Sequence, residues 1–379
     1  MSDARAAPLA QLTSLRFLAA LLVFFSHLAF LERSNSPFLR ELYDLFFRQG
    51  ACGVTFFFIL SGFILTHAYE QTLQRGEIPV AIYLYRRAAR IFPLHLMAAG
   101  AFLGYLAIRH DLPVWRAVPL NLALLHSWFP DPLVHYSLNG PSWSLSNELF
   151  FYLLFPLLVR VDARMLQQAF LAGAIIIIAG ACVAASVVDG YSPFVDWLFY
   201  AFPLTRLLEF VAGILLCRAW RAGVGYSWAT GWVEALLVLT IGATMVSVEW
   251  FAIPLAFRYQ LAFLPPMAAL ILVFAYGRGV LAQWLRSPVL QRLGEASFAL
   301  YLVHRPLITF LERWSGRNAT SDGALALAML LLAVGIAIAT FVLVDRSLQS
   351  WLRRFEPLLV ATRRAGKKPA DSAPTVRPL

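Results

Sequence analysis

The sequence has few charged residues and very little cysteine. Charged side chains make up 14% of the 379 residues and hydrophobic ones 60%, whereas a soluble domain has about 25% charged residues. This composition excludes an ordinary soluble enzyme and indicates a multi-pass membrane protein. The three cysteines, Cys52, Cys182 and Cys217, lie in or beside apolar runs. Their spacing excludes a disulfide framework and a zinc site.

Several motifs of soluble enzymes and pumps are missing. The chain has no G-x-S-x-G elbow, no Walker A loop and no Rossmann glycine fingerprint, so a soluble-type hydrolase and an ATP-driven pump have no support. Five histidines lack metal-ligand spacing, and we expect no metal site: His67, His95, His110, His126 and His135. The net charge of +10 is better explained by membrane topology than by nucleic-acid binding.

Apolar runs recur from one end of the chain to the other. With about 20 apolar residues per membrane span, ten helices are predicted, at 12–31, 50–69, 88–108, 142–160, 168–188, 196–217, 231–249, 257–276, 294–312 and 322–344. The stretch 113–135 is rich in Pro and Trp, and we expect it at the interface. The sequence thus predicts one all-α integral membrane bundle, 1–352, followed by a basic, disordered cytoplasmic tail, 353–379.

The basic residues set the expected orientation. Lys and Arg gather at the N-terminus, in the loops after the second, fourth, sixth and eighth spans, and in the tail. The positive-inside rule therefore places both termini in the cytoplasm, which agrees with an even number of helices. The first apolar run continues without a signal-peptide cleavage site, so we expect it to remain as the first span.

Arg16 and His27 lie eleven residues apart in one apolar run, LTSLRFLAALLVFFSHLAF. On a helix this spacing gives about 16 Å of rise and brings both side chains to within about 20° of one face. Polar groups at membrane depth are costly and typical of functional sites. Alone, Arg16 could reach the headgroups and His27 could bond a neighbouring helix. Together they favour a site, with Arg16 near the cytoplasm and His27 nearer the far side.

A second pair of cations precedes the third span. Arg86 and Arg90, in IYLYRRAARIFPLHL, are four residues apart and share one helix face. Two guanidinium groups on one face can bracket a phosphate or pyrophosphate with bidentate hydrogen bonds. The predicted loop is cytoplasmic, where nucleotides and coenzymes are available. The alternative is that both are ordinary topology charges.

A carboxylate begins the fourth span. Glu148, in GPSWSLSNELFFYLLFPLL, is expected at or just inside the outer membrane face. A carboxylate there needs a partner, so Glu148 either orients an imidazole or forms half of a structural ion pair. Trp143 and Ser144, one turn earlier, are candidate site-lining residues.

Two later spans also carry polar groups. Arg206 and Glu209, in PLTRLLEFVAGILLC, are three residues apart, and we expect a structural pair that neutralises itself. His304, in GEASFALYLVHRPLI, is either a packed polar residue or a residue that lines a site.

Taken together, these stretches resemble the acyltransferase-3 family of bacterial membrane O-acyltransferases. The resemblance rests on LTSLRFLAALLVFFSH, GVTFFFILSGFILT, YRRAARIFPLH, PSWSLSNELFFYLLFP, RLLEFVAGILL and GEASFALYLVHRPL, which follow in family order over residues 12–310. It implies a ten-helix fold in the bacterial cytoplasmic (inner) membrane, in the standalone form. It also implies transfer of an acyl group, often acetyl, from acyl-CoA to a hydroxyl of a cell-envelope carbohydrate or small metabolite, with no bound cofactor.

The resemblance also assigns roles to residues. The essential arginine and histidine of the first span correspond to Arg16 and His27, and the donor-binding R-x3-R pair to Arg86 and Arg90. The carboxylate of the W-S-L-S-x-E stretch corresponds to Glu148. Two departures stand out: Leu149 replaces a usual second acidic residue, and Asp345-Arg346-Ser347 replaces the usual Glu-x-Pro after the last span.

These residues predict a mechanism. The phosphates of coenzyme A would bind Arg86 and Arg90, and the pantetheine arm would pass Arg16 and bring the thioester to His27. His27, with an unperturbed pKa of about 6.5, would act as general base on the acceptor hydroxyl or carry the acyl group itself, and Glu148 could hold its reactive tautomer. Two other classes stay open: a transporter or flippase of an anionic lipid-linked or glycan substrate, and a membrane scaffold.

Overall fold

A computed structural model describes residues 9–314 and 322–356, which form helices joined by turns and loops, with no strand in these ranges. The helices of ten residues or more are α1 (Ala10–Ser26), α3 (Cys52–Gln74), α4 (Val80–Ile108), α7 (Trp143–Leu158), α8 (Ala163–Val187), α10 (Pro203–Arg221), α11 (Gly231–Trp250), α13 (Leu264–Tyr276), α15 (Pro288–Trp314) and α16 (Asp322–Thr340). The all-helical prediction is confirmed for the described residues.

Shorter α-helices connect these elements: α2 (Pro37–Leu42), α5 (Ala117–Leu122), α6 (Pro132–His135), α9 (Pro193–Asp196), α12 (Leu255–Arg258), α14 (Val280–Trp284) and α17 (Arg346–Arg353). Local sequence explains several of their starts. Ser36, Asp131 and Ser192 each cap a helix whose first residue is proline, because a side-chain oxygen satisfies a free N–H and proline needs none. The stretch 113–135 forms only α5, α6 and a single 3-10 turn, η4 (His126–Trp128), between them.

Every predicted span falls on a helix, but not every helix is long enough to be counted as a crossing. Among the described residues, six segments are long and apolar enough to span a membrane: Pro37–Gln74, Val80–Ile108, Ala163–Val187, Pro193–Arg221, Gly231–Trp250 and Asp322–Arg353. Two shorter apolar helices are Ala10–Ser26 and Leu264–Tyr276. The chain is therefore a multi-pass membrane protein, while the count of ten crossings and the side of the termini stay predictions.

Two close helix contacts build the centre of the bundle. Gly294 on α15 lies against the backbone carbonyl of Thr13 on α1, and Gly213 on α10 lies against that of Ile59 on α3. A Cβ atom at either glycine would collide with the facing backbone, so only glycine permits this separation. The first contact places α15 along α1, which brings the HRP segment of α15 beside the end of α1.

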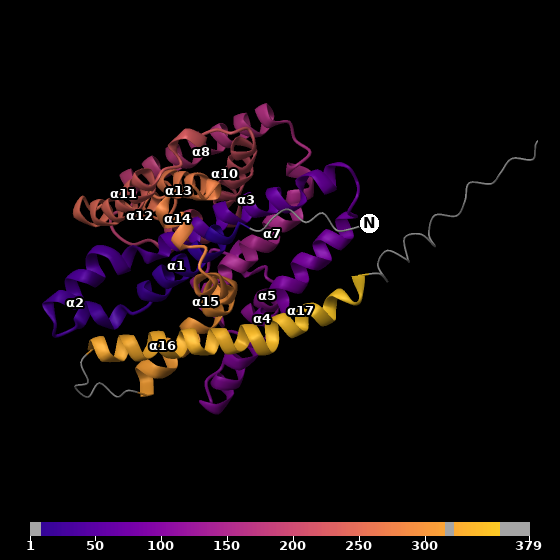
Figure 1. Ribbon diagram of the computed structural model, residues 1–379. Coiled ribbons are helices and arrows are strands. Elements are labelled where there is room, and N and C mark those ends of the chain that lie inside the picture. The colour runs from indigo at the N-terminus through magenta and orange to yellow at the C-terminus, as the bar shows by residue number, and fades with distance from the viewer. Residues whose placement is uncertain (1–8, 315–321, 357–379) are drawn as a thin grey trace, which may run out of the picture.

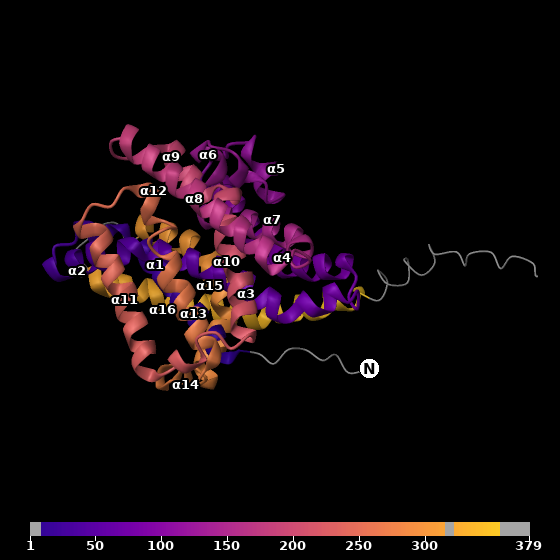
Figure 2. The same ribbon diagram turned by 90° about the horizontal axis from the view of Figure 1, so that it is seen from above.

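The last helices run along one side of the molecule. In Figure 1, α16 and α17 form one rod across the lower part of the molecule, joined through a π-helical turn, η8 (Phe341–Asp345). The opposite side holds α8, α10, α11 and α13. Seen from above, α5, α6 and α9 gather at one edge and α14 lies at the opposite edge (Figure 2). The predicted tail begins at 353, yet Arg353 still belongs to α17; residues 357–379 lie outside the described residues.

Candidate active site

Two cavities lie along α1, one near each of its two polar residues. Arg16 lines a small cavity of about 40 Å³. His27, which directly follows α1, lines a large one of about 630 Å³. Val54 and Tyr301 line both cavities, and both side chains are buried. The predicted stripe therefore borders two separate spaces with a common wall.

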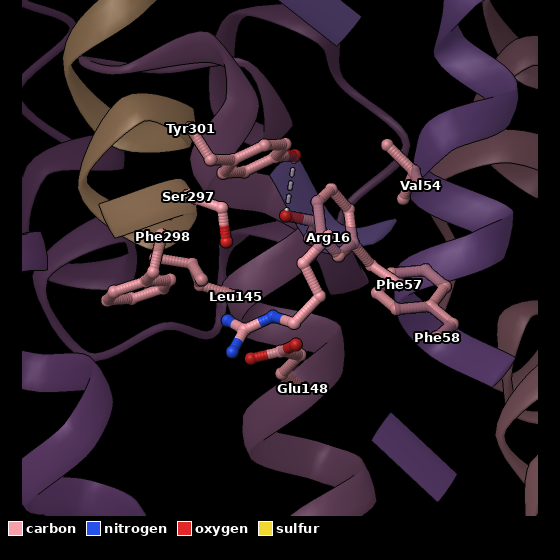
Figure 3. A pocket seen from close by; sticks show the side chains of 10 residues that line it. Arg16, Val54, Phe57, Phe58, Leu145, Glu148, Ser297, Phe298 and Tyr301 are labelled. Atoms are coloured by element: carbon pink, nitrogen blue, oxygen red, sulfur yellow. Dashed lines mark hydrogen bonds between the residues drawn. The ribbon is translucent and has the colours of Figure 1, made fainter. Parts of the chain in front are cut away.

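The small cavity is lined by one cation and one carboxylate. The guanidinium of Arg16 points toward the carboxylate of Glu148 (Figure 3). Tyr152, one turn after Glu148 on α7, donates a hydrogen bond to Glu148 Oε2 (3.1 Å). Ser144 and Ser297 also line this space. The cavity is thus a compact polar niche between apolar helices.

The structure corrects the expected position of Glu148. It was expected at or just inside the outer membrane face, either orienting an imidazole or forming half of an ion pair, but it lines the cavity of Arg16, and His27 lines the other one. The reason is the start of α7 at Trp143, which lines the large cavity. Glu148 follows five residues later, about 7.5 Å further along the helix, at the level of Arg16. Glu148 therefore does not orient the imidazole of His27.

Two other groups hold the His27 ring. His27 Nδ1 lies 2.8 Å from the backbone carbonyl oxygen of Val23 and 3.4 Å from Ser26 Oγ. A carbonyl oxygen only accepts, so Nδ1 carries the proton, and in the neutral ring Nε2 keeps a free lone pair. Within residues 9–314 and 322–356, Nε2 has no hydrogen-bond partner. The ring thus offers a base to the large cavity.

The ring of His304 contacts the ring of His27. Its Nε2 lies 3.3 Å from His27 Nδ1, and its Nδ1 lies 3.2 Å from the carbonyl oxygen of Leu300. By the same reasoning His304 carries its proton on Nδ1 and presents the Nε2 lone pair to His27. His304 is buried and makes an edge-on ring contact with His27 (centroids 4.8 Å apart). It therefore supports the His27 ring and is not itself among the residues that line the large cavity.

The large cavity has an aromatic wall with a few polar groups. Its aromatic lining is Phe102, Tyr136, Trp143, Tyr191, Tyr200, Tyr259 and Tyr301. Asp196, buried at the end of α9, accepts a hydrogen bond from Tyr136 (2.7 Å). Arg305, next to His304, also lines the cavity, and no described carboxylate lies within ion-pair distance of it. A cavity of this size and lining suits a small organic molecule.

The two arginines of the R-x3-R pair are both bound to carboxylates from the C-terminal segment. Arg86 makes a bidentate contact with Glu356, with Nη2 2.8 Å from Oε2 and Nε 3.1 Å from Oε1. Arg90 Nη1 donates to Asp345 Oδ2 (2.7 Å). Arg86 and Arg90 remain about one quarter exposed. Both guanidinium groups are therefore accessible and already hold anionic groups.

Arg90 also links this surface to the small cavity. Its guanidinium lies over the ring of Phe298 (5.1 Å from the centroid), and Phe298 lines the small cavity. Arg87 turns away, donating to the hydroxyl of Tyr69 (3.1 Å). A continuous series of contacts thus runs from Arg90 through Phe298 to the niche of Arg16 and Glu148.

The Arg206–Glu209 pair is buried behind the large cavity. Arg206 Nε lies 3.0 Å from Glu209 Oε2, and both side chains are fully buried. Arg206 also donates to Thr55 Oγ1 (3.2 Å). Its guanidinium lies over the rings of Phe58, Trp143 and Tyr200. Because Trp143 and Tyr200 line the large cavity, the pair supports the cavity wall and does not open into the cavity.

Most residues that line the two cavities were absent from the sequence-based prediction of the site, among them Val54, Asp196, Tyr301 and Arg305. For Arg305 a signal existed, since a cation inside a predicted span is a functional candidate by itself. Asp196 opens a predicted span and carried the same signal. Val54 and Tyr301 have no such signal, because one apolar and one aromatic residue in a helix are ordinary core residues.

Comparison with known proteins agrees with this architecture. The family model described as "Acyltransferase domain" (Acyl_transf_3) matches residues 9–344. The chain is 34% identical to acyltransferase MdmB of Streptomyces mycarofaciens, over 94% of this chain and 96% of that protein. It is 28% identical to exopolysaccharide production protein ExoZ of Rhizobium meliloti, over 85% and 95% of the two chains. It is 27% identical to nodulation protein 10 of Rhizobium leguminosarum bv. viciae, over 76% and 80%. No solved structure matches. The chain is an acyltransferase and belongs to the acyltransferase-3 family.

Proposed function

We propose that this protein moves an acyl group from cytoplasmic acyl-CoA to a hydroxyl of a cell-envelope carbohydrate or small metabolite, and that this acyl group is acetyl. It would do so in the cytoplasmic membrane of a bacterium, with both termini in the cytoplasm. The observation that carries the proposal is the contact of His27 Nδ1 with the carbonyl oxygen of Val23. A carbonyl oxygen only accepts, so this contact assigns the ring proton to Nδ1, and within the described residues it leaves Nε2 without a hydrogen-bond partner in a side chain that lines the large cavity. This is the state that a general base requires.

The reaction balances with the groups at this site. The acceptor hydroxyl gives its proton to His27 Nε2 while its oxygen bonds to the thioester carbonyl carbon. The resulting tetrahedral intermediate collapses, the C–S bond breaks, and the coenzyme A thiolate leaves and takes the proton back from His27. The products are an O-acyl ester and free coenzyme A, with no oxidant or reductant needed.

Arg305 is the residue that we assign to the developing negative charge. It lines the same cavity as His27 and makes no ion pair within the described ranges. A guanidinium there favours the oxyanion of the intermediate over the neutral thioester, which is how an enzyme accelerates acyl transfer. Arg16 cannot share this role, because eleven residues of helix separate it from His27 by about 16 Å.

His304 is expected to act through His27. When His27 accepts a proton on Nε2, its Nδ1–H becomes a stronger donor, and the His304 Nε2 lone pair can accept it. His304→Leu removes this acceptor, and we expect kcat to fall about tenfold or more with an unchanged donor KM. His304→Gln offers an amide oxygen at a similar position and should recover most of the loss. Equal kcat values for Leu and Gln would contradict this positioning role.

The donor would bind at the surface of Arg86 and Arg90. Coenzyme A carries several phosphate oxygens, and these match the bidentate geometry that Arg86 now uses for Glu356. Phosphates would therefore replace the carboxylates of Glu356 and Asp345. The pantetheine arm would then follow the Arg90–Phe298 contact into the niche of Arg16 and Glu148.

Substitutions of Arg86 and of its partner Glu356 should change the KM for acetyl-CoA in opposite directions. Arg86→Ala should raise the KM for acetyl-CoA about tenfold or more, because a charge-assisted hydrogen bond is worth about 1.5–3 kcal/mol. Glu356→Gln should lower this KM by up to about fivefold, since a partly exposed ion pair contributes at most about 1 kcal/mol. Steady-state release of coenzyme A from acetyl-CoA measures both.

Arg75→Ala is the matched control for these variants. Arg75 lies in the same predicted cytoplasmic loop and pairs with Glu77 at the surface (3.7 Å), so its loss should leave the donor KM unchanged. An equal rise in KM for Arg75→Ala and Arg86→Ala would show that loop charge, and not a donor site, is responsible.

The acceptor class rests on the relatives and on the cavity. One relative is named for exopolysaccharide production, and the aromatic wall with Asp196 offers flat apolar faces and a hydrogen-bond acceptor. Such a lining suits a sugar ring or a polyhydroxylated metabolite. A hydroxyl of either would point at His27.

Transfer of label tests the proposed function. Membranes that contain the protein are incubated with acetyl-labelled acetyl-CoA and with glycan and metabolite extracts of the producing cell. Covalent label in a glycan or metabolite, with a mass gain of one acetyl group, is the expected result. Movement of substrate across vesicles without covalent label would instead indicate a transporter or flippase. If neither label transfer nor movement of substrate is seen, the protein would be a scaffold.

A further inference from the structure

Asp196, at the end of α9, is the only carboxylate among the described residues that line the large cavity. It is 5% exposed. Tyr136, which directly follows α6, donates a hydrogen bond to Asp196 Oδ2 (2.7 Å), and α6 and α9 lie together at one edge of the molecule (Figure 2). The other oxygen, Oδ1, accepts no hydrogen bond within residues 9–314 and 322–356 and is not enclosed by them. Oδ1 is therefore accessible from the cavity.

Asp196 also has no counter-charge among the described residues. Two cations line the same cavity, Arg48 and Arg305, and neither lies within ion-pair distance of Asp196. Arg48 instead pairs with Glu32 (3.0 Å) and with Asp44. A buried carboxylate without a cation is costly and typical of a functional site. We therefore expect a ligand to supply the positive charge.

Tyrosine side chains surround this carboxylate. The charge of Asp196 acts on four hydroxyls that belong to cavity-lining residues, those of Tyr136, Tyr191, Tyr200 and Tyr259. The rings of Tyr200 and Tyr259 lie against each other, with centroids 4.4 Å apart. Aromatic faces attract cations, and a set of such faces is the usual recognition device for alkylated ammonium groups. A carboxylate among tyrosines is thus suited to a positively charged nitrogen.

The opposite charge in the cavity comes from a different element. Arg305 lies on α15 directly after His304, whose ring contacts His27, and the charge of Arg305 acts on His27. Asp196 lies on α9 and is bonded to Tyr136. The cavity therefore has a positive group beside the proposed base and a negative group among the tyrosines. A molecule with a hydroxyl at one end and a cation at the other would match both.

We infer that Asp196 and the tyrosines around it bind a cationic nitrogen of the acceptor, which is then an amino-bearing sugar or metabolite with its reactive hydroxyl toward His27. The inference rests on the proposed function, because it assigns the large cavity to the acceptor, and it adds the charge of that molecule. A neutral acceptor would leave Asp196 without a counter-charge. An ammonium group supplies it through a charge-assisted hydrogen bond and cation–π contacts.

Binding of two matched sugars tests the charge preference. Methyl glucosaminide and methyl glucoside differ at one ring position, where the first has an ammonium group and the second a hydroxyl. Their dissociation constants are measured by isothermal titration calorimetry with the full chain in detergent, without acyl-CoA, at a pH at which the amine is protonated. The wild type should bind the glucosaminide at least about tenfold more tightly, because charge-assisted hydrogen bonds are about twice as strong as neutral ones and cation–π attraction adds to them.

Asp196→Asn separates charge from shape. It keeps the size of the side chain and an oxygen that can accept from Tyr136, but it removes the negative charge. The preference for the glucosaminide should fall to about twofold, which the aromatic rings alone provide, and the affinity for the glucoside should change little. Asp111→Asn is the matched control. Asp111 is exposed and lies 3.9 Å from Arg109 at the surface, so this variant should keep the wild-type preference.

Equal binding of both sugars by the wild type, or no binding of the glucosaminide, would overturn the inference. An undiminished preference in Asp196→Asn would do the same. The wild-type measurement needs no variant, so it decides the matter even if Asp196→Asn fails to fold. Transfer of labelled acetyl without any charge preference in binding would leave the proposed function standing without the inference. A charge preference that depends on Asp196, with no acetyl transfer to any acceptor, would leave the cation site standing and overturn the proposed function.

Discussion

His27→Ala is expected to lower kcat for acetyl transfer by about 10²- to 10⁴-fold, the usual contribution of a positioned general base. The substitution removes the only ring that combines a free Nε2 with a place on the large cavity among the described residues. The KM for acetyl-CoA should change little, because the donor phosphates would bind at Arg86 and Arg90, at the other end of the path. Steady-state transfer of labelled acetyl, normalised to protein amount, measures the loss.

The control for this variant is His67→Ala. His67 lies on α3 outside both cavities, with its ring edge-on to Trp220 (centroids 5.4 Å apart), so its removal should leave kcat near the wild-type value. Full transfer activity of His27→Ala would remove the central claim. A drop in kcat together with a lost ability to bind acetyl-CoA would instead point to misfolding.

Helical periodicity predicted one stripe for Arg16 and His27, and in the structure the two residues line neighbouring cavities. The relative position of the two side chains follows from the periodicity of a single helix, which depends only on local backbone geometry. The partner of His27 could not be predicted in the same way. His304 reaches it from a position 277 residues later, through the close approach of α15 to α1 at Gly294. Sequence spacing contains no information on which helix packs against which.

Of the two alternatives for Glu148, orientation of an imidazole was wrong for a related reason. The start of its helix was predicted within one residue, because the expected span began at 142 and α7 begins at Trp143. The error lay in the depth of the side chain: Glu148 follows Trp143 by five residues, about 7.5 Å along the helix, and this places Glu148 at the small cavity while Trp143 lines the large one. Depth estimates from hydropathy are too coarse to decide which of two cavities a residue lines.

Arg86 and Arg90 show a third limit. Their spacing on one face was predicted, and α4 carries both. Their partners come from the segment 345–356, of which residues from 353 onward were expected to be a disordered tail. In the structure Glu356 binds Arg86 across a separation of 270 residues. Nothing in the sequence indicates that a carboxylate in a basic, proline-rich segment has a specific partner, and only the fold shows which cation it contacts.

Removal of one partner of the Arg206–Glu209 pair is the second large effect that we expect. Glu209→Ala should lower the free energy of unfolding by about 3–5 kcal/mol, because it leaves the fully buried Arg206 without its counter-charge. Thermal unfolding in detergent, followed by tryptophan fluorescence, measures the change. Activity should fall with it, because Arg206 lies over Trp143 and Tyr200 in the wall of the large cavity.

The double variant Arg206→Met with Glu209→Leu distinguishes a structural pair from a site. It removes both charges and keeps most of the volume, so it should recover most of the stability that Glu209→Ala loses. Arg75→Ala, which breaks the exposed pair with Glu77, should change stability by less than about 1 kcal/mol. If the double variant is stable but inactive, then the charges themselves serve the reaction. If it is as unstable as Glu209→Ala, then the rings around Arg206 depend on the cation, and the pair shapes the large cavity through them.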